Sequence, residues 1–196
     1  SDLIFLEGHF ESEKYFKNVK DEIQKEFTFS DTSIYKKSPF YNDLINQNSV
    51  SICLRSNRFI EGKNNILKNH LIKSRIFQDE QIKYINKSIN YFKDKIDNPT
   101  FFIWSNDFKN IDLSLFSEKI TKIDHDEIFT SNIYKRSLDL FLISQCNHHI
   151  VIPSSFNWWG AWLCNHKNKI ICRPNESLFT HFRLNNSDFW PSSWIK

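Results

Sequence analysis

Two arginines and two serines have the residue types and the spacing expected of a phosphate-binding site. Arg55 directly follows the apolar run at 50–54, and Arg58 lies three residues further on. Ser154 and Ser155 follow a second apolar run and Pro153. A guanidinium binds phosphate oxygens in a bidentate manner, and the N–H groups at the start of a helix bind anions. The four residues therefore fit a diphosphate ligand, although surface ion pairs and a simple helix cap fit them about as well.

Carboxylates occupy two further positions of interest. Asp107, after Asn106, follows the apolar run at 101–104, and Asp139 lies within the apolar stretch LDLFLI. A carboxylate in apolar surroundings needs hydrogen-bond donors, because an unpaired buried charge is costly. The N1–H and 2-amino groups of guanine would supply such donors to Asp139, and a neighbouring backbone N–H or arginine would serve equally well.

The histidines and cysteines do not predict a metal site. His148 and His149 are adjacent in a predicted strand, so their side chains should point to opposite faces, and we expect one exposed and one packed. Four cysteines, which lack CxxC spacing, lie in or beside apolar segments: Cys53, Cys146, Cys164 and Cys172. We expect four reduced, buried thiols, as in a cytoplasmic protein.

Strands and helices alternate along the chain. The apolar patterns predict strands at 50–54, 101–104, 119–124, 149–152 and 169–173, and helices at 12–27, 79–96, 113–116, 132–145 and 153–166. Residues 56–73 are polar, and we interpret them as a loop. This alternation predicts an α/β fold with a Rossmann-like, mostly parallel sheet and flanking helices. Ligands of such sheets bind beyond the carboxyl ends of the strands, which directs attention to 55–58, 105–107 and 153–157.

The composition excludes several other classes. The chain has 196 residues, 40% of them hydrophobic, which suffices for a core, and its net charge of +3 is dispersed rather than gathered in a basic stripe. We therefore expect no nucleic-acid partner. No apolar run reaches the ~18 residues of a transmembrane helix. Three glycines leave no room for a GxGxxG fingerprint.

One block of the sequence identifies a family. SLDLFLISQCNHHIVIPSSFNWWGAWL, at 137–163, closely resembles the most recognisable block of the bacterial α-1,2-fucosyltransferases, glycosyltransferase family 11. FLEGHFESEKYFKNVKDEIQKEFTF, at 5–29, and FFIWSNDF, at 101–108, resemble other segments of that family in the same order. The resemblance implies a GT-B-type enzyme, of which this chain is the C-terminal half. Such an enzyme transfers L-fucose from GDP-β-L-fucose, with inversion and without a metal or other cofactor, to a galactose hydroxyl (α-1,2).

The resemblance also assigns roles to residues. It places Asp139 on guanine, Ser155 and the adjacent Ser154 on the diphosphate, and Arg55 on the β-phosphate as the catalytic arginine. The donor-binding residues that we expect are Arg55, Arg58, Asn106, Asp107, Asp139, Ser154, Ser155 and Phe156.

The chain departs from the family in two motifs, of which the smaller change is SND in place of SDD, leaving Asn106 and Asp107. HxRRxDY appears here as CLRSNRF, so that Cys53 replaces the histidine, Ser56 the second arginine and Arg58 the aspartate. Arg58 could restore the lost charge. The changed motif leaves open a different GDP-sugar donor.

The expected organisation has two parts. Residues 1–48 are interpreted as a helical linker or remnant of an acceptor-side domain, and 49–196 as the Rossmann-like domain that binds the GDP-sugar. A chain with only this half should bind donor and fail to transfer, and a non-catalytic paralogue is a further alternative. Glu7, Glu11 and Glu61 are carboxylates near the predicted cleft, and surface solvation is the favoured interpretation of each.

The expected partners are a GDP-sugar donor and a galactose-containing glycan acceptor of a lipopolysaccharide or capsule. The expected location is cytoplasmic, with peripheral contact to a lipid-linked acceptor at the inner face of the membrane.

Overall fold

The computed structural model describes residues 12–29, 31–125, 132–175, 178 and 188–196. Within them lies one five-stranded sheet in which every pairing is parallel, in the order β3-β2-β1-β4-β5. The strands are β1 (Asn48–Leu54), β2 (Pro99–Ser105), β3 (Ile120–Lys122), β4 (His148–Ile150) and β5 (Ile171–Cys172). The predicted α/β class and parallel Rossmann-like sheet are confirmed, and each expected strand is present at its predicted place.

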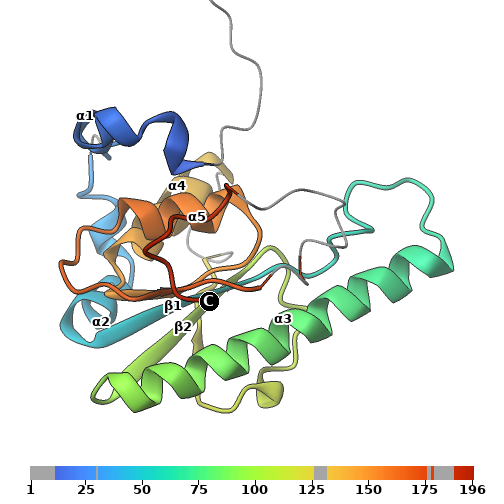
Figure 1. The fold of residues 1–196 in the computed structure, drawn as a ribbon. Helices are drawn as coiled ribbons and strands as arrows, with labels where there is room; N and C mark the ends of the chain where they lie inside the picture. Colours follow the sequence, from blue (N-terminus) through green and yellow to red (C-terminus); the bar gives the residue numbers. More distant parts are fainter. Residues whose placement is uncertain (1–11, 30, 126–131, 176–177, 179–187) are drawn as a thin grey trace, which may run out of the picture.

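Helices cover both faces of this sheet. Figure 1 shows α3 (Lys68–Lys95) along one face, and α4 (Asn132–Gln145) and α5 (Ser155–Leu163) on the other. Two short helices precede the sheet, α1 (Lys20–Glu26) and α2 (Tyr41–Asn46). Single 3-10 turns occupy Glu13–Tyr15, Lys17–Val19, Tyr35–Lys37 and Leu113–Leu115. No helix of the described part of the chain is both long and apolar enough to cross a membrane.

Two helix predictions need correction. The helix expected at 12–27 is broken into two 3-10 turns and the short α1. The loop expected at 56–73 is wrong from residue 68 onward, because α3 begins at Lys68 rather than Asp79. The first turns of α3 expose Leu71, Ile72 and Ile76, so they show no buried stripe by which the sequence pattern could reveal them. They form because elongating an existing helix adds a hydrogen bond for each residue fixed.

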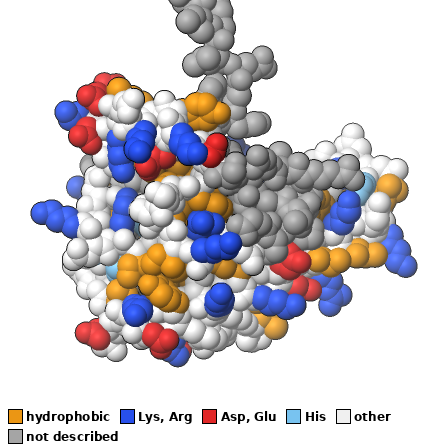
Figure 2. All heavy atoms as spheres, in the orientation of Figure 1, with side chains coloured by type: hydrophobic (Ala, Val, Ile, Leu, Met, Phe, Trp, Pro, Cys, Tyr) orange, Lys and Arg blue, Asp and Glu red, His pale blue; other side chains and the backbone are white. Residues whose placement is uncertain are grey.

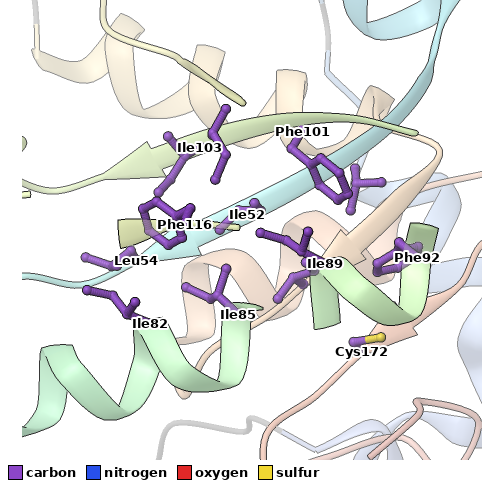
Figure 3. Packing of buried hydrophobic residues seen from close by; sticks show 13 residues of the cluster. Ile52, Leu54, Ile82, Ile85, Ile89, Phe92, Phe101, Ile103, Phe116 and Cys172 are labelled. Atoms are coloured by element: carbon purple, nitrogen blue, oxygen red, sulfur yellow. The ribbon is translucent and has the colours of Figure 1, made fainter. Parts of the chain in front are cut away.

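The face of the sheet beneath α3 is a dry apolar layer. Figure 3 shows Ile52, Leu54 and Ile103 of the strands pointing toward Ile85 and the other inward side chains of α3. The apolar residues of this helix are spaced three and four residues apart in the sequence, which places them on one side of the helix. The buried members from α3 are Ile82, Ile85, Ile89 and Phe92.

The opposite face holds two clusters. Alternate strand residues such as Cys53, Phe102 and Trp104 pack against Leu138 and Leu142 of α4. Leu44 of α2 is fully buried in the same cluster. Some residues before position 48 thus pack on the sheet, while the division into domains at 48/49 stays a prediction.

The third cluster surrounds the tryptophans of α5. Trp158 and Trp162 are buried, and Trp159 stacks on Phe27 and Phe16 with centroid distances of 4.9 and 5.5 Å. These indoles are therefore packing residues. Gly160 permits close contact with α4, because a Cβ there would lie 2.5 Å from Cγ2 of Ile143.

Charged side chains of both signs are interspersed over the face of the molecule shown in Figure 2. They surround scattered apolar side chains of the described residues, and the lysines and arginines there form no continuous stripe.

Candidate functional site: the carboxyl edge between β1 and β4

The order of the strands creates a switch point between β1 and β4. The chain proceeds from β1 outward through β2 and β3, and then returns to β4 on the other side of β1. Val50, Ser51 and Ile52 pair with His148, His149 and Ile150, which brings the ends of the two strands level. Crevices of α/β proteins form where connections leave two neighbouring strands in opposite directions. The segments after Leu54 and after Ile152 therefore lie at the same carboxyl edge of the sheet, after two neighbouring strands, as their sequence positions predicted.

Arg55 is held at this edge by its backbone. Its N–H donates to Oε1 of Gln81 and its C=O accepts from Nε2 of Gln81, both at 3.0 Å, and Gln81 is fully buried in α3. The guanidinium forms an ion pair with Glu61. Nε of Arg55 is buried without a hydrogen-bond partner among the described residues. The guanidinium thus has binding capacity that its ion pair does not use.

Asn106 and Asp107 fix the loop after β1 rather than standing alone. Asn106 accepts from the N–H of Ser56 at 3.0 Å and donates to its C=O at 3.1 Å. Asp107 accepts from Nδ2 of Asn57, a residue with a positive φ of 57°. Arg58 lies on the exposed part of this loop. The structure thus brings the ends of β1 and β2 together, although the polar atoms of Asn106 are engaged with the chain itself.

The N-terminus of α5 is open. Ser154 takes the N-cap position with extended backbone angles, as predicted, but its side chain makes no capping hydrogen bond. Ser155 and Phe156 are exposed. The first N–H groups of a helix have no partner within it, and they carry the positive end of its dipole. This end of α5 can therefore accept an anion at the crevice.

The C-terminus of α5 is closed by Lys169. Its ammonium donates to the carbonyl oxygens of Ala161, Trp162 and Cys164 at 3.2, 3.1 and 2.6 Å. Burial lowers the pKa of this lysine. Sequence analysis missed this residue, because only the turn that follows the helix brings it back to the last carbonyls.

Asp139 lies in α4 with its side chain 21% exposed. Its Oδ1 accepts a hydrogen bond from Nδ1 of His125 at 3.1 Å. Burial raises the pKa of the Cys53 thiol, and the nearby charge of Asp139 raises it further. Asp139 is therefore near the end of β1, on the face that α4 covers. Sequence analysis missed His125, although a histidine directly after a predicted strand was the available signal.

The two histidines of β4 are both buried, so the expectation of one exposed histidine is wrong. Helices cover both faces of the sheet, and side chains on either side of a central strand are then enclosed. His148 faces Phe92 of α3, accepts from the N–H of Ile170, and has its pKa lowered by burial to about 4. His149 contacts the hydroxyl of Ser51 at 2.8 Å, and burial lowers its pKa as well. Both imidazoles are neutral at pH 7.

The four cysteines are free and buried, as expected. Burial raises the pKa of each thiol, that of Cys172 to about 12. They are therefore packing residues. Among the described residues, no group of three histidine, cysteine, aspartate or glutamate side chains could hold a metal ion.

Two predicted carboxylates, Glu7 and Glu11, lie outside the described residues. Glu61 is half-exposed and pairs with Arg55, so its carboxylate is engaged with a residue of the crevice rather than only with solvent.

A parallel α/β sheet with an uncapped helix N-terminus at its switch point is the arrangement of a Rossmann-like fold. The chain belongs to glycosyl transferase family 11, whose model matches residues 1–195. The expected family is thereby confirmed.

Curated relatives are similar over much of the chain. An alpha-1,2-colitosyltransferase of Escherichia coli is 28% identical over 96% of this chain and 61% of its own length. The O-antigen biosynthesis glycosyltransferase WbnK of the same species is 27% identical over 57% of this chain and 35% of its own length. Galactoside alpha-(1,2)-fucosyltransferase 2 of Rattus norvegicus is 25% identical over 76% of this chain and 40% of its own length. The chain thus spans less than two thirds of each of these relatives.

Proposed function

We infer that this chain binds the GDP moiety of GDP-β-L-fucose and serves an inverting transfer of L-fucose to a galactose hydroxyl (α-1,2) of a surface glycan. The observation that carries this proposal is the switch point between β1 and β4, where Arg55 follows β1 and the uncapped N-terminus of α5 follows β4. A guanidinium and a row of backbone N–H groups suit the two charges of a diphosphate.

The proposed chemistry is displacement at C1 of the fucosyl group. The bond from C1 to the β-phosphate oxygen breaks as the acceptor oxygen bonds to C1 from the opposite side, and the acceptor hydroxyl loses its proton. Negative charge develops on the β-phosphate of the departing GDP. Arg55 and the start of α5 at Ser154 and Ser155 would stabilise that charge, which is electrostatic catalysis that requires no metal ion.

In the structure the guanidinium of Arg55 is paired with the carboxylate of Glu61. Binding of a diphosphate would replace the carboxylate of Glu61 as the partner of the guanidinium. Because this pair is partly exposed to solvent, exchanging one anionic partner for another costs little. Asn106 and Asp107 would act mainly by holding the loop that carries Arg55 and Arg58, and Phe156 would lie beside the bound sugar nucleotide.

A second donor is favoured by one specific observation. The relative that matches 96% of this chain is named a colitosyltransferase. A colitosyl group is a fucosyl group without its 3-hydroxyl, so both would present the same leaving group to the crevice. The altered CLRSNRF motif, with Arg58 in place of an acidic residue, fits a change of sugar better than a change of nucleotide. The acceptor is proposed to be a lipid-linked glycan at the inner face of the cytoplasmic membrane.

Calorimetric titration of the chain with GDP, GDP-fucose, GDP-mannose and ADP tests the donor proposal. We expect GDP and GDP-fucose to bind similarly, GDP-mannose more weakly, and ADP at least tenfold more weakly than GDP, with no change on adding EDTA. Equal affinity for ADP and GDP would contradict a guanine-specific site.

Transfer requires a separate measurement on the full-length gene product. A galactose-terminated acceptor is incubated with GDP-fucose, and the anomeric configuration and linkage of the product are read by NMR. We expect an α-1,2 linkage. If GDP binds to the chain but the full-length protein transfers nothing, the chain belongs to a non-catalytic nucleotide-binding protein instead.

A further inference from the structure

A buried chain of hydrogen bonds runs inward from Asp139. Nδ1 of His125 lies 3.1 Å from Oδ1 of Asp139, and Nε2 of the same ring lies 3.3 Å from Oγ of Ser38. His125 is 1% exposed and Ser38 5%, whereas the side chain of Asp139 is 21% exposed. The three residues come from the segment before α2, the end of β3, and α4. Of these three residues, Asp139 is therefore the one whose side chain can contact a ligand.

The order of the three groups matches that of a nucleophilic triad, but the burial is reversed. In such a triad the serine hydroxyl is the group that reaches the substrate. Here Ser38 is enclosed, and its oxygen accepts a further hydrogen bond from the N–H of Phe40 at 3.4 Å. The ring of Phe40 also packs edge-on against His125 with a centroid distance of 5.4 Å. The serine end of the chain thus fixes the imidazole, and it has no path to a substrate.

One protonation state satisfies all three groups. An ionised carboxylate only accepts hydrogen bonds, so Nδ1 of His125 must carry the proton that it shares with Asp139. In the neutral ring Nε2 is then an acceptor, and the hydroxyl of Ser38 donates to it. The carboxylate of Asp139 is held by one oxygen, so that its rotation is fixed while the remaining lone pairs can accept from another donor.

We propose that His125 is a positioning residue for guanine recognition: it fixes the orientation in which Asp139 accepts from the N1–H and 2-amino groups of the base. This inference rests on the proposed binding of GDP and adds a residue to it. A carboxylate with a fixed rotation loses less conformational freedom on binding than one that turns, so the gain falls on the nucleotide whose donors match that orientation. Inosine diphosphate, which keeps N1–H and lacks the 2-amino group, would gain less.

Two replacements of His125 separate positioning from packing. His125→Asn keeps a donor where Nδ1 stands and loses the contact with Ser38, while His125→Gln keeps a polar group near Nε2 and loses the contact with Asp139. Each is a neutral amide in the same pocket. We expect the ratio of GDP to IDP affinity, measured by calorimetry on the full chain, to stay within about twofold of the original in His125→Asn and to fall about tenfold in His125→Gln. Equal ratios in the two variants, or the reverse order, would overturn the proposal.

Asp139→Asn separates failure of this inference from failure of the proposed function. A GDP to IDP ratio unchanged in Asp139→Asn would show that Asp139 does not contact the 2-amino group, whereas a ratio lost there and kept in His125→Gln would reject His125 alone.

A measurement on the unaltered protein covers variants that do not fold. The Nδ1–H resonance of His125 is followed by NMR without nucleotide and with saturating GDP or IDP. We expect GDP to shift this resonance more than IDP does, because the 2-amino group of guanine draws charge from the shared carboxylate. No shift with GDP would overturn the proposal.

Discussion

The two ends of α5 differ in whether other residues form hydrogen bonds with their backbone groups. At the C-terminal end, the ammonium of Lys169 binds three carbonyl oxygens, those of Ala161, Trp162 and Cys164. At the N-terminal end, Ser154 leaves the N–H groups uncapped, and Ser155 is exposed. Both ends of a helix present four unsatisfied groups. The fold satisfies the end that lies away from the switch point and leaves the end at the switch point for a ligand.

Within this helix of nine residues, we therefore expect the C-terminal end to serve stability and the N-terminal end to serve ligand binding. A change at the closed end should act on the free energy of unfolding, and a change at the open end should act on nucleotide affinity.

Replacement of Lys169 should have the largest effect. Lys169→Met keeps the length of the side chain and removes the ammonium, which leaves three carbonyls near the buried tryptophans without their donor. We expect a loss of about 3 kcal/mol in the free energy of unfolding, measured by urea denaturation. Lys167→Met, at an exposed position two residues earlier, is the matched control and should change it by less than about 0.5 kcal/mol. Equal losses of unfolding free energy in the two variants would show that the hydrogen bonds of Lys169 to the last carbonyls of α5 do not stabilise the fold.

Acid should weaken the packed region next to the closed end. Burial and the neighbouring His166 lower the folded-state pKa of His148 to about 4, against 6.5 for the free group. The unfolded chain therefore binds the proton more readily, and stability is lost as the pH falls from 6.5 toward 4. We expect this histidine to contribute about 2 kcal/mol to the difference in stability between pH 7.5 and pH 5.

His148→Asn isolates that contribution. The amide oxygen can replace Nδ1 as the acceptor for the N–H of Ile170 without titrating. In this variant, the difference in unfolding free energy between pH 7.5 and pH 5 should be smaller by about 2 kcal/mol, the contribution expected of His148. An unchanged difference would mean that His148 is protonated equally in both states.

Removal of Arg55 should act on the open end alone. Arg55→Ala takes away the guanidinium that we place on the β-phosphate, and we expect GDP affinity to fall about tenfold or more in calorimetry. Arg75→Ala, another arginine, on α3, is the control for net charge and should leave affinity within about twofold. If affinity is unaltered in Arg55→Ala, the diphosphate is bound elsewhere.

Neutralising Glu61 should have the smallest effect, and in the opposite direction. Glu61→Gln removes the carboxylate that pairs with Arg55, so a diphosphate no longer competes with it. We expect GDP affinity to rise about two- to threefold. Glu118→Gln, which breaks the ion pair with Lys93, should leave affinity as it was. Weaker GDP binding in Glu61→Gln would mean that Glu61 assists the arginine rather than occupying it.

The parallel sheet and the junctions at its carboxyl edge could be predicted because they depend on local patterns. Apolar runs such as 50–54 and 101–104 end in polar residues, and strand–helix alternation places those ends at one edge. The place where α5 begins followed from Pro153 and the two serines, whereas the missing side-chain cap did not. Residues that act within one junction are thus visible in the sequence.

Contacts between distant segments could not be predicted in this way. Ser38 and His125 are separated by 87 positions, and nothing local indicates that the segment before α2 and the segment after β3 share a buried pocket. The burial of both His148 and His149 depends on helices that cover both faces of β4, which strand alternation alone does not specify. The early start of α3 has the same origin, since its first turns bury little that a pattern could show.

The contrast between the two ends of α5 is tested most directly by following backbone amides during a titration with GDP. In an isotope-labelled chain, we expect the N–H resonances of Ser155, Phe156 and Asn157 to shift strongly at saturating GDP, while those of Cys164 and Asn165 stay in place. Unmoved amides at the start of α5, with GDP bound, would contradict the account.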